Sequence, residues 1–175
     1  MAERPIGEFS APSMEERVNN WKLFFKGENT RKLLGFFYGS EFPAQRYHAA
    51  LSLPEGRDLV PGDFCVESYL DDNERLFEEM ELFPGDFIFS ASAFWGIPWL
   101  EAAIGCPIRI NHVTGSLYAV KPEWSGEPSV PEFEPDSPWT RKLLEFLTKA
   151  ASKSRGRYPL ATTRMRGIAD LLSAI

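Results

Sequence analysis

The C-terminal part of the chain predicts three elements in succession: a helix, a short strand and a second helix. Ser137 and Pro138 are favoured at the start of a helix, and a long apolar face follows them. A β-rich run at 158–162 comes next, and Gly167 leads into a helical pattern at 168–175. Such a unit is the repeat of a parallel α/β fold.

A single unit of this kind is incomplete, because a parallel strand needs partner strands for its backbone hydrogen bonds. We therefore expect the native partner strands to lie beyond Ile175. The apolar positions of the two helices recur at helical spacing. In the first helix they are Leu143, Leu144, Leu147, Ala150 and Ala151, and in the second they are Ile168, Leu171, Leu172 and Ile175.

The N-terminal part predicts a helix over 14–25. Ser13 and Glu16 have the spacing of a capping box, and Gly27 is suited to the end of the helix. An apolar stripe is expected to pack at the edge of the fold, formed by Val18, Trp21 and Phe25.

The middle of the chain is less regular. Glycines and prolines interrupt 31–61, which predicts loops or a short hairpin. Strands are expected at 64–70 and 87–90, with a helix starting at Asp71 or Asp72 between them. One face of that helix should consist of Leu76, Phe77 and Met80.

The stretch 94–107 is the most distinctive part of the sequence. Pro98 is suited to the first turn of a helix, and Gly105 to the position just after its end. Trp99 and Glu101 lie in this otherwise apolar helix, so the Glu101 carboxylate must be paired in place or line a pocket. Trp99 has the alternative of simple packing in the core.

A β-hairpin is expected after this helix, with strands at 108–111 and 116–120. The proline-rich, acidic stretch 121–138 predicts an extended connector and is the best candidate for a boundary. We divide the chain into an N-terminal extension with early α/β elements, 1–135, and the helix–strand–helix unit, 136–175.

Charge and composition limit the classes of partner. The formal net charge of the 175 residues is −6, which provides no basic field for nucleic acid. No apolar stretch approaches the roughly 20 residues of a membrane span, and no signal peptide precedes the fold, so we expect a cytoplasmic protein. Cys65 and Cys106 are expected to be buried thiols.

From 72 onward the sequence resembles the uroporphyrinogen decarboxylase superfamily, which includes the decarboxylase of haem synthesis and corrinoid-dependent methyltransferases. The resemblance is carried by the helix opening Pro138-Trp139-Thr140-Arg141, by the strand Gly156-Arg157-Tyr158-Pro159-Leu160 and by Arg166-Gly167-Ile168-Ala169-Asp170. In the family the last motif is a glycine, usually followed by proline, that opens a helix after an inner barrel strand. Ile168 replaces that proline here.

The resemblance implies an α/β fold that is the incomplete N-terminal part of a (β/α)₈ TIM barrel, with an N-terminal helical and β-hairpin extension. A barrel site lies at the carboxyl ends of the strands. The candidate substrate-binding residues are then Trp99, Glu101, Thr163, Arg164, Arg166 and Asp170. The arginines have the alternative of being solvated surface charges.

Two departures favour the methyltransferase-like branch over the true decarboxylase. Gln45-Arg46-Tyr47 is the nearest match to the arginine-rich run that grips propionates, and Phe89-Ser90-Ala91 has alanine where the decarboxylase has aspartate. The resemblance implies zinc and a corrinoid for the complete parent protein. Neither His48 nor His112 has a Cys or a second His at ligand spacing, so we assign no metal or cofactor to this chain.

The leading hypothesis is an N-terminal fragment of a uroporphyrinogen decarboxylase-like enzyme that transfers methyl groups with a corrinoid protein partner and acts on a small molecule. Decarboxylation of a porphyrinogen-like substrate is the first alternative. A binding or scaffold domain without catalysis is the second. We expect the fragment alone to be inactive, because the catalytic groups of a barrel come from the ends of several strands.

Overall fold

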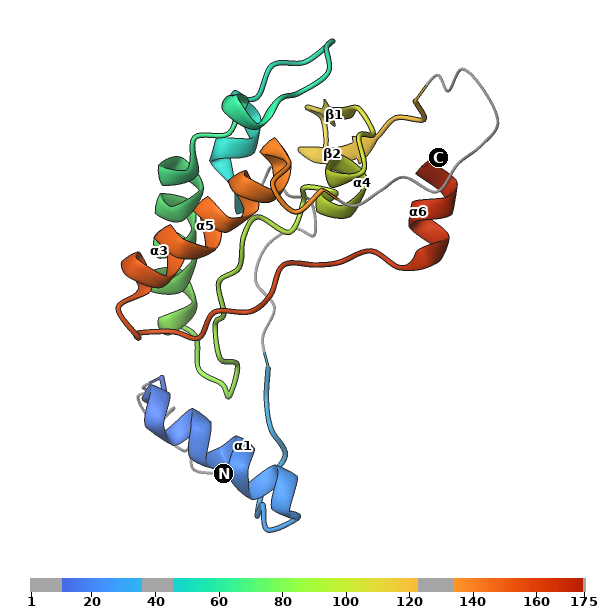
Figure 1. Cartoon of the computed structure of the whole chain (residues 1–175). Helices are drawn as coiled ribbons and strands as arrows, with labels where there is room; N and C mark the ends of the chain where they lie inside the picture. Colours follow the sequence, from blue (N-terminus) through green and yellow to red (C-terminus); the bar gives the residue numbers. More distant parts are fainter. Residues whose placement is uncertain (1–10, 36–45, 123–133, 175) are drawn as a thin grey trace.

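The computed structural model describes residues 11–35, 46–122 and 134–174, which form a mixed α and β structure (Figure 1). A layer of helices holds most of the core, and a small antiparallel sheet lies beside it. The elements are α1 (Met14–Lys26), the 3₁₀ turns η1 (His48–Ser52) and η2 (Pro61–Asp63), α3 (Val66–Glu81), α4 (Trp99–Ala103), β1 (Ile108–Asn111), β2 (Ser116–Ala119), α5 (Pro138–Ser154) and α6 (Ile168–Ala174).

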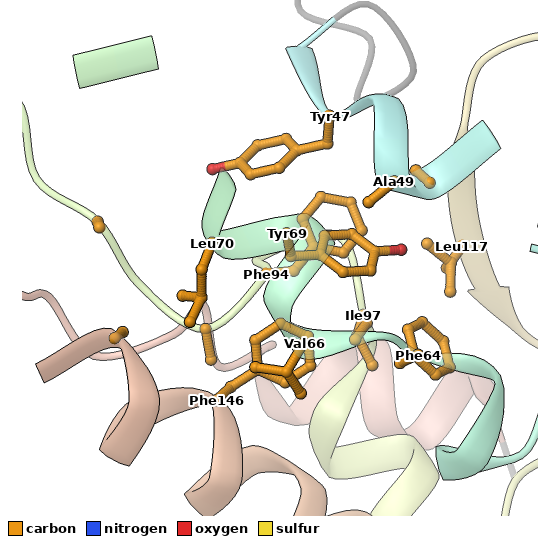
Figure 2. Close-up of a cluster of buried hydrophobic side chains, with 14 of the residues drawn as sticks. Tyr47, Ala49, Phe64, Val66, Tyr69, Leu70, Phe94, Ile97, Leu117 and Phe146 are labelled. Carbon is orange, nitrogen blue, oxygen red and sulfur yellow. The ribbon is translucent and has the colours of Figure 1, made fainter. Parts of the chain in front are cut away.

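Aromatic side chains hold the core together between α3, α4 and α5 (Figure 2). The ring of Tyr69 lies 4.8 Å from that of Phe94 and 5.5 Å from that of Phe146, centroid to centroid. Trp99 reaches the same Phe146 ring at 5.8 Å. These spacings are those of favourable aromatic pairs. Phe146 therefore joins α5 to elements that precede the connector, so 1–135 and 136–175 share one core.

Helix α3 corrects the prediction of a strand at 64–70. The helix starts at Val66, so the apolar run that we assigned to a strand forms its first turns. The buried side chains recur every three or four residues, as a helix requires, but two of them are polar: Asp72 and Asn73. These polar positions concealed the helical pattern. The buried set is Val66, Tyr69, Leu70, Asp72, Asn73, Leu76 and Met80.

The predicted starts of α1 and α5 are confirmed. Ser13 and Glu16 form the reciprocal hydrogen bonds of a capping box, and Gly27 ends α1 with a φ of 72°. At the start of α5 the Ser137 hydroxyl accepts a hydrogen bond from the backbone N–H of Thr140. The ends of these helices follow from local chemistry alone.

The faces of α1 and α5 differ from the predicted stripes. On α1 the buried residue is Arg17, whereas the side chain of Phe25 is 78% exposed. Arg17 donates to the carboxylate of Glu81 at 2.5 Å and to the backbone oxygen of Phe87 at 3.3 Å. On α5 the buried positions are Phe146, Ala150 and Ser154, while Leu144 and Ala151 are exposed.

A second buried charge fixes α1 to the loop after α3. Asp86 accepts hydrogen bonds from the guanidinium of Arg31 at 2.6 and 2.7 Å, from the amide of Asn20 at 2.8 Å and from the backbone N–H of Leu34 at 2.9 Å. The indole N–H of Trp21 donates to the backbone oxygen of Asp86 at 2.7 Å. We call this set the α1 anchor.

The predicted hairpin is confirmed as β1 and β2, which pair antiparallel with Ile108 opposite Ala119 and Ile110 opposite Leu117. Both isoleucines and Leu117 are buried, so one face of the hairpin covers the core. Alternation of apolar and polar residues specified this element correctly. The second strand ends at Ala119, one residue before the predicted end.

The predicted strands at 87–90 and 158–162 do not form. Instead, two extended segments meet at a single parallel bridge between Ala91 and Leu160. The N–H of Ala91 donates to the oxygen of Pro159 at 3.1 Å, and the N–H of Ala161 donates to the oxygen of Ala91 at 2.8 Å. Pro159 has no N–H to extend the ladder. The C-terminal segment nonetheless has a parallel neighbour within the chain.

The predictions for the cysteines, the connector and membrane spans have different outcomes. The thiol of Cys106 is buried as predicted, but that of Cys65 is exposed beside the first turn of α3. The connector 121–138 lies for the most part outside the described residues, as does 36–45 of the predicted loop region. Among the described residues, no helix combines the length and the apolar character needed to cross a membrane.

Candidate functional site

The two extended segments stay in register beyond the bridge between Ala91 and Leu160. The hydroxyl of Thr163 donates to the backbone oxygen of Ala93 at 3.2 Å. One step further, the guanidinium carbon of Arg164 lies 5.1 Å from the ring centroid of Trp95. Polar and charged side chains therefore follow the carboxyl ends of two parallel segments.

The next pair along the same edge joins Arg166 to Glu101. Nη1 of Arg166 lies 3.4 Å from Oε1 of Glu101. We call the five side chains that follow the bridge the rim cluster: Trp95, Glu101, Thr163, Arg164 and Arg166. In α/β folds, ligands bind outside the carboxyl ends of parallel strands, which is the position of this cluster relative to the bridge.

Glu101 is held in place by the short helix α4. Gly105, with a φ of 93°, turns the chain immediately after the helix, and the N–H of Cys106 donates to the backbone oxygen of Glu101 at 2.9 Å. The Glu101 side chain is 1% exposed, yet neither of its carboxylate oxygens accepts a hydrogen bond from any described residue. Burial of a carboxylate that accepts no hydrogen bond costs free energy of folding, and such groups are rare in folded proteins.

The arginines of the cluster face water more than Glu101 does. The side chain of Arg166 is 36% exposed, and that of Arg164 lies on the face of the Trp95 ring as a cation–π contact. Burial, and to a smaller extent the charge of Glu101, raises the pKa of the neighbouring Cys106 thiol. That thiol is therefore protonated near neutral pH.

The predicted site residues are not all brought together. Glu101, Thr163, Arg164 and Arg166 lie along one edge, as described above. Trp99 packs in the core, where its indole N–H donates to the backbone oxygen of Phe94 at 3.0 Å. Asp170 caps α6 by accepting a hydrogen bond from the N–H of Gly167 at 3.2 Å.

Sequence reasoning missed Trp95, which supports Arg164. Its sequence signal was its place in the distinctive stretch 94–107, next to the helix that carries Glu101. Nothing in the sequence indicated that the register of two extended segments would place Arg164 on its ring.

A concave region of about 700 Å³ lies apart from the rim cluster, between α3 and α5. Several of its charged residues form ion pairs between the two helices or next to them. Lys149 contacts Glu67 at 2.5 Å, and Arg157 contacts Glu74. These ion pairs join the helices, while the lining as a whole carries more basic residues than carboxylates: Lys149, Lys153, Arg155 and Arg157 against Glu67 and Glu74.

The residue types that hold metals are dispersed. Within the described ranges, no three His, Cys, Asp or Glu side chains lie close enough together to hold a metal ion. His112 instead makes a 2.6 Å hydrogen bond between its Nε2 and the backbone oxygen of Leu53. Comparison of the chain with models of protein families, with characterised proteins and with solved structures finds no match.

Proposed function

We propose that this chain is the front part of a uroporphyrinogen decarboxylase-like barrel enzyme, and that the rim cluster is one wall of its substrate site. The observation that carries the proposal is the buried carboxylate of Glu101, with its unmade hydrogen bonds, at the carboxyl side of a parallel pair of segments. Buried polar groups that lack hydrogen bonds are found most often at functional sites.

The preferred chemistry is transfer of a methyl group from a methylated corrinoid carried by a partner protein. The basis for this preference is the resemblance, in which Phe89-Ser90-Ala91 departs from the decarboxylase and Gly167 keeps the helix-opening glycine. In this proposal the rim cluster binds the substrate.

Individual members of the rim cluster have separate roles in this proposal. Arg164, oriented by the Trp95 ring, is placed to pair with an acidic group of the substrate, because a guanidinium binds planar anions through two parallel hydrogen bonds. Thr163, tied to Ala93, holds the segment that carries both arginines against the neighbouring segment.

The direct test is a methyl-transfer assay on the complete product of the gene, with methylcobalamin and a thiol acceptor. We expect loss of the methylcobalamin absorbance, at a rate that falls in the Arg164→Ala variant. Absence of demethylation together with decarboxylation of a porphyrinogen would move the assignment to the other branch. If the protein does neither, the enzyme assignment fails.

A further inference from the structure

Three buried carboxylates of the described residues differ in how they are satisfied. Asp86 accepts four hydrogen bonds in the α1 anchor. Asp72 accepts from the N–H of Ala49 at 2.9 Å and from Arg75 at 3.2 Å. The oxygens of Glu101 accept none from the described residues. A carboxylate accepts up to about four hydrogen bonds, so Glu101 has the most unused capacity of the three.

Among the described residues, the charged neighbour of Glu101 at ion-pair distance is Arg166, and it does not fill that capacity. Nη1 of Arg166 lies at 3.4 Å without hydrogen-bond geometry, and more than a third of the Arg166 side chain is exposed to water. Much of the guanidinium hydration is therefore retained, while the carboxylate has lost its own. Arg166 balances the charge of Glu101 but leaves its hydrogen bonds unmade.

The position of Arg166 allows this contact to be exchanged. The residue is the last before Gly167, and α6 beyond it is short, with exposed apolar side chains such as Ile168 and Leu172. The long Arg166 side chain is already 36% exposed, so it can turn further toward water.

We propose that Glu101 is the recognition group for a protonated amine of the ligand, and that Arg166 covers the carboxylate until that amine replaces it. One cation exchanges for another, so the charge of the buried site is conserved. An ammonium donates up to three hydrogen bonds and forms strong charge-assisted bonds to a carboxylate. This inference rests on the proposed function for the placement of the site, and it specifies the class of ligand.

The test uses n-butylammonium as the probe and titrates it against the 175-residue chain at constant ionic strength, with binding followed by amide chemical shifts in NMR spectra. We expect shifts localised to α4 and to the segment before α6. Glu101→Gln should weaken binding by about tenfold or more, because a charge-assisted hydrogen bond is lost.

Arg166→Met provides an independent variant, since it removes the competing cation and leaves Glu101 in place. The proposal requires this variant to bind the probe more tightly than the unmodified chain. Glu67→Gln is the matched control, because Glu67 is an exposed carboxylate on α3 that pairs with Lys149. It should leave binding unchanged and so exclude general attraction of amines to an acidic protein.

Equal binding by the unmodified chain and Glu101→Gln would overturn the proposal, as would weaker binding by Arg166→Met or the absence of any localised shift. These outcomes are separable from the failure of the proposed function. Methyl transfer without amine binding would remove only the role of Glu101, and amine binding without methyl transfer would remove only the assigned chemistry.

Discussion

In Figure 1, α1 lies below the layer of α3 and α5 and α6 lies to its right, and the chain next to each of these helices carries an arginine that pairs with a buried carboxylate. At the α1 anchor, Asp86 is surrounded by donors from Arg31, Asn20 and Leu34. Next to α6, the contact that the described residues make with the Glu101 carboxylate is a 3.4 Å ion pair with Arg166.

The two buried carboxylates have different roles in the protein. A carboxylate that is surrounded by donors has its desolvation offset, so Asp86 stabilises the attachment of α1. A carboxylate with unmade hydrogen bonds destabilises the fold in which it is buried, and such groups persist where they serve a ligand. The same pair of residue types thus forms a structural contact at one edge and a candidate site at the other.

The largest expected difference is in the amide hydrogen exchange rates of α5 and α6, the two helices of the C-terminal unit. Helix α5 packs on α3 and α4, whereas α6 is short and mostly exposed. We expect the amides of α6 to exchange at least about a hundredfold faster than those at the centre of α5. Equal protection of both helices would show that α6 is as firmly held as α5, and would contradict the weak attachment of α6.

Removing the anchor carboxylate should have the largest effect of the substitutions considered. Asp86→Ala is expected to lower the free energy of unfolding by about 3 kcal/mol, because several hydrogen bonds to a charged group are lost. Chemical denaturation measures this change. Asp58→Ala is the control, since Asp58 forms an exposed ion pair with Arg109 at 2.7 Å and should change stability by less than about 1 kcal/mol.

The α1 anchor should also make the free energy of unfolding depend on pH. The Arg31 guanidinium, helped by the N–H of Leu34 and the amide of Asn20, lowers the pKa of Asp86 to about 2. Because the pKa is lower in the folded state than in the unfolded state, the stabilisation is full above about pH 4 and is lost as the pH falls toward 2. The stability gap between the unmodified chain and Asp86→Asn should shrink over that interval. A gap that is constant with pH would contradict this account.

Much of the fold was predictable because it is specified locally. The caps at Ser13 and Ser137, the helix end at Gly27 and the hairpin β1–β2 each depend on residues close together in sequence. The predictions were wrong where contacts between residues far apart in the sequence determine the structure. Arg17 is buried because it meets Glu81 and Phe87, and α3 begins in an apolar run that resembles a strand.

The candidate site was predictable only in part, for the same reason. The setting of Glu101 in an apolar helix showed that its carboxylate had to be paired or line a pocket, and Arg166 was named as a candidate independently. Arg166 approaches Glu101 without a hydrogen bond. This position depends on the bridge between Ala91 and Leu160, two residues that are far apart in the sequence. Such register is not encoded in any short stretch of sequence.

The most direct test of the contrast is a measurement of the unfolding free energies of two isosteric variants, Asp86→Asn and Glu101→Gln, at neutral pH by chemical denaturation. We predict opposite signs. Asp86→Asn should lose about 2 kcal/mol, because its charge is well satisfied, and Glu101→Gln should gain about 1 kcal/mol, because an unsatisfied buried charge is removed. A loss of stability in both variants would contradict the account and would make Glu101 a structural residue like Asp86.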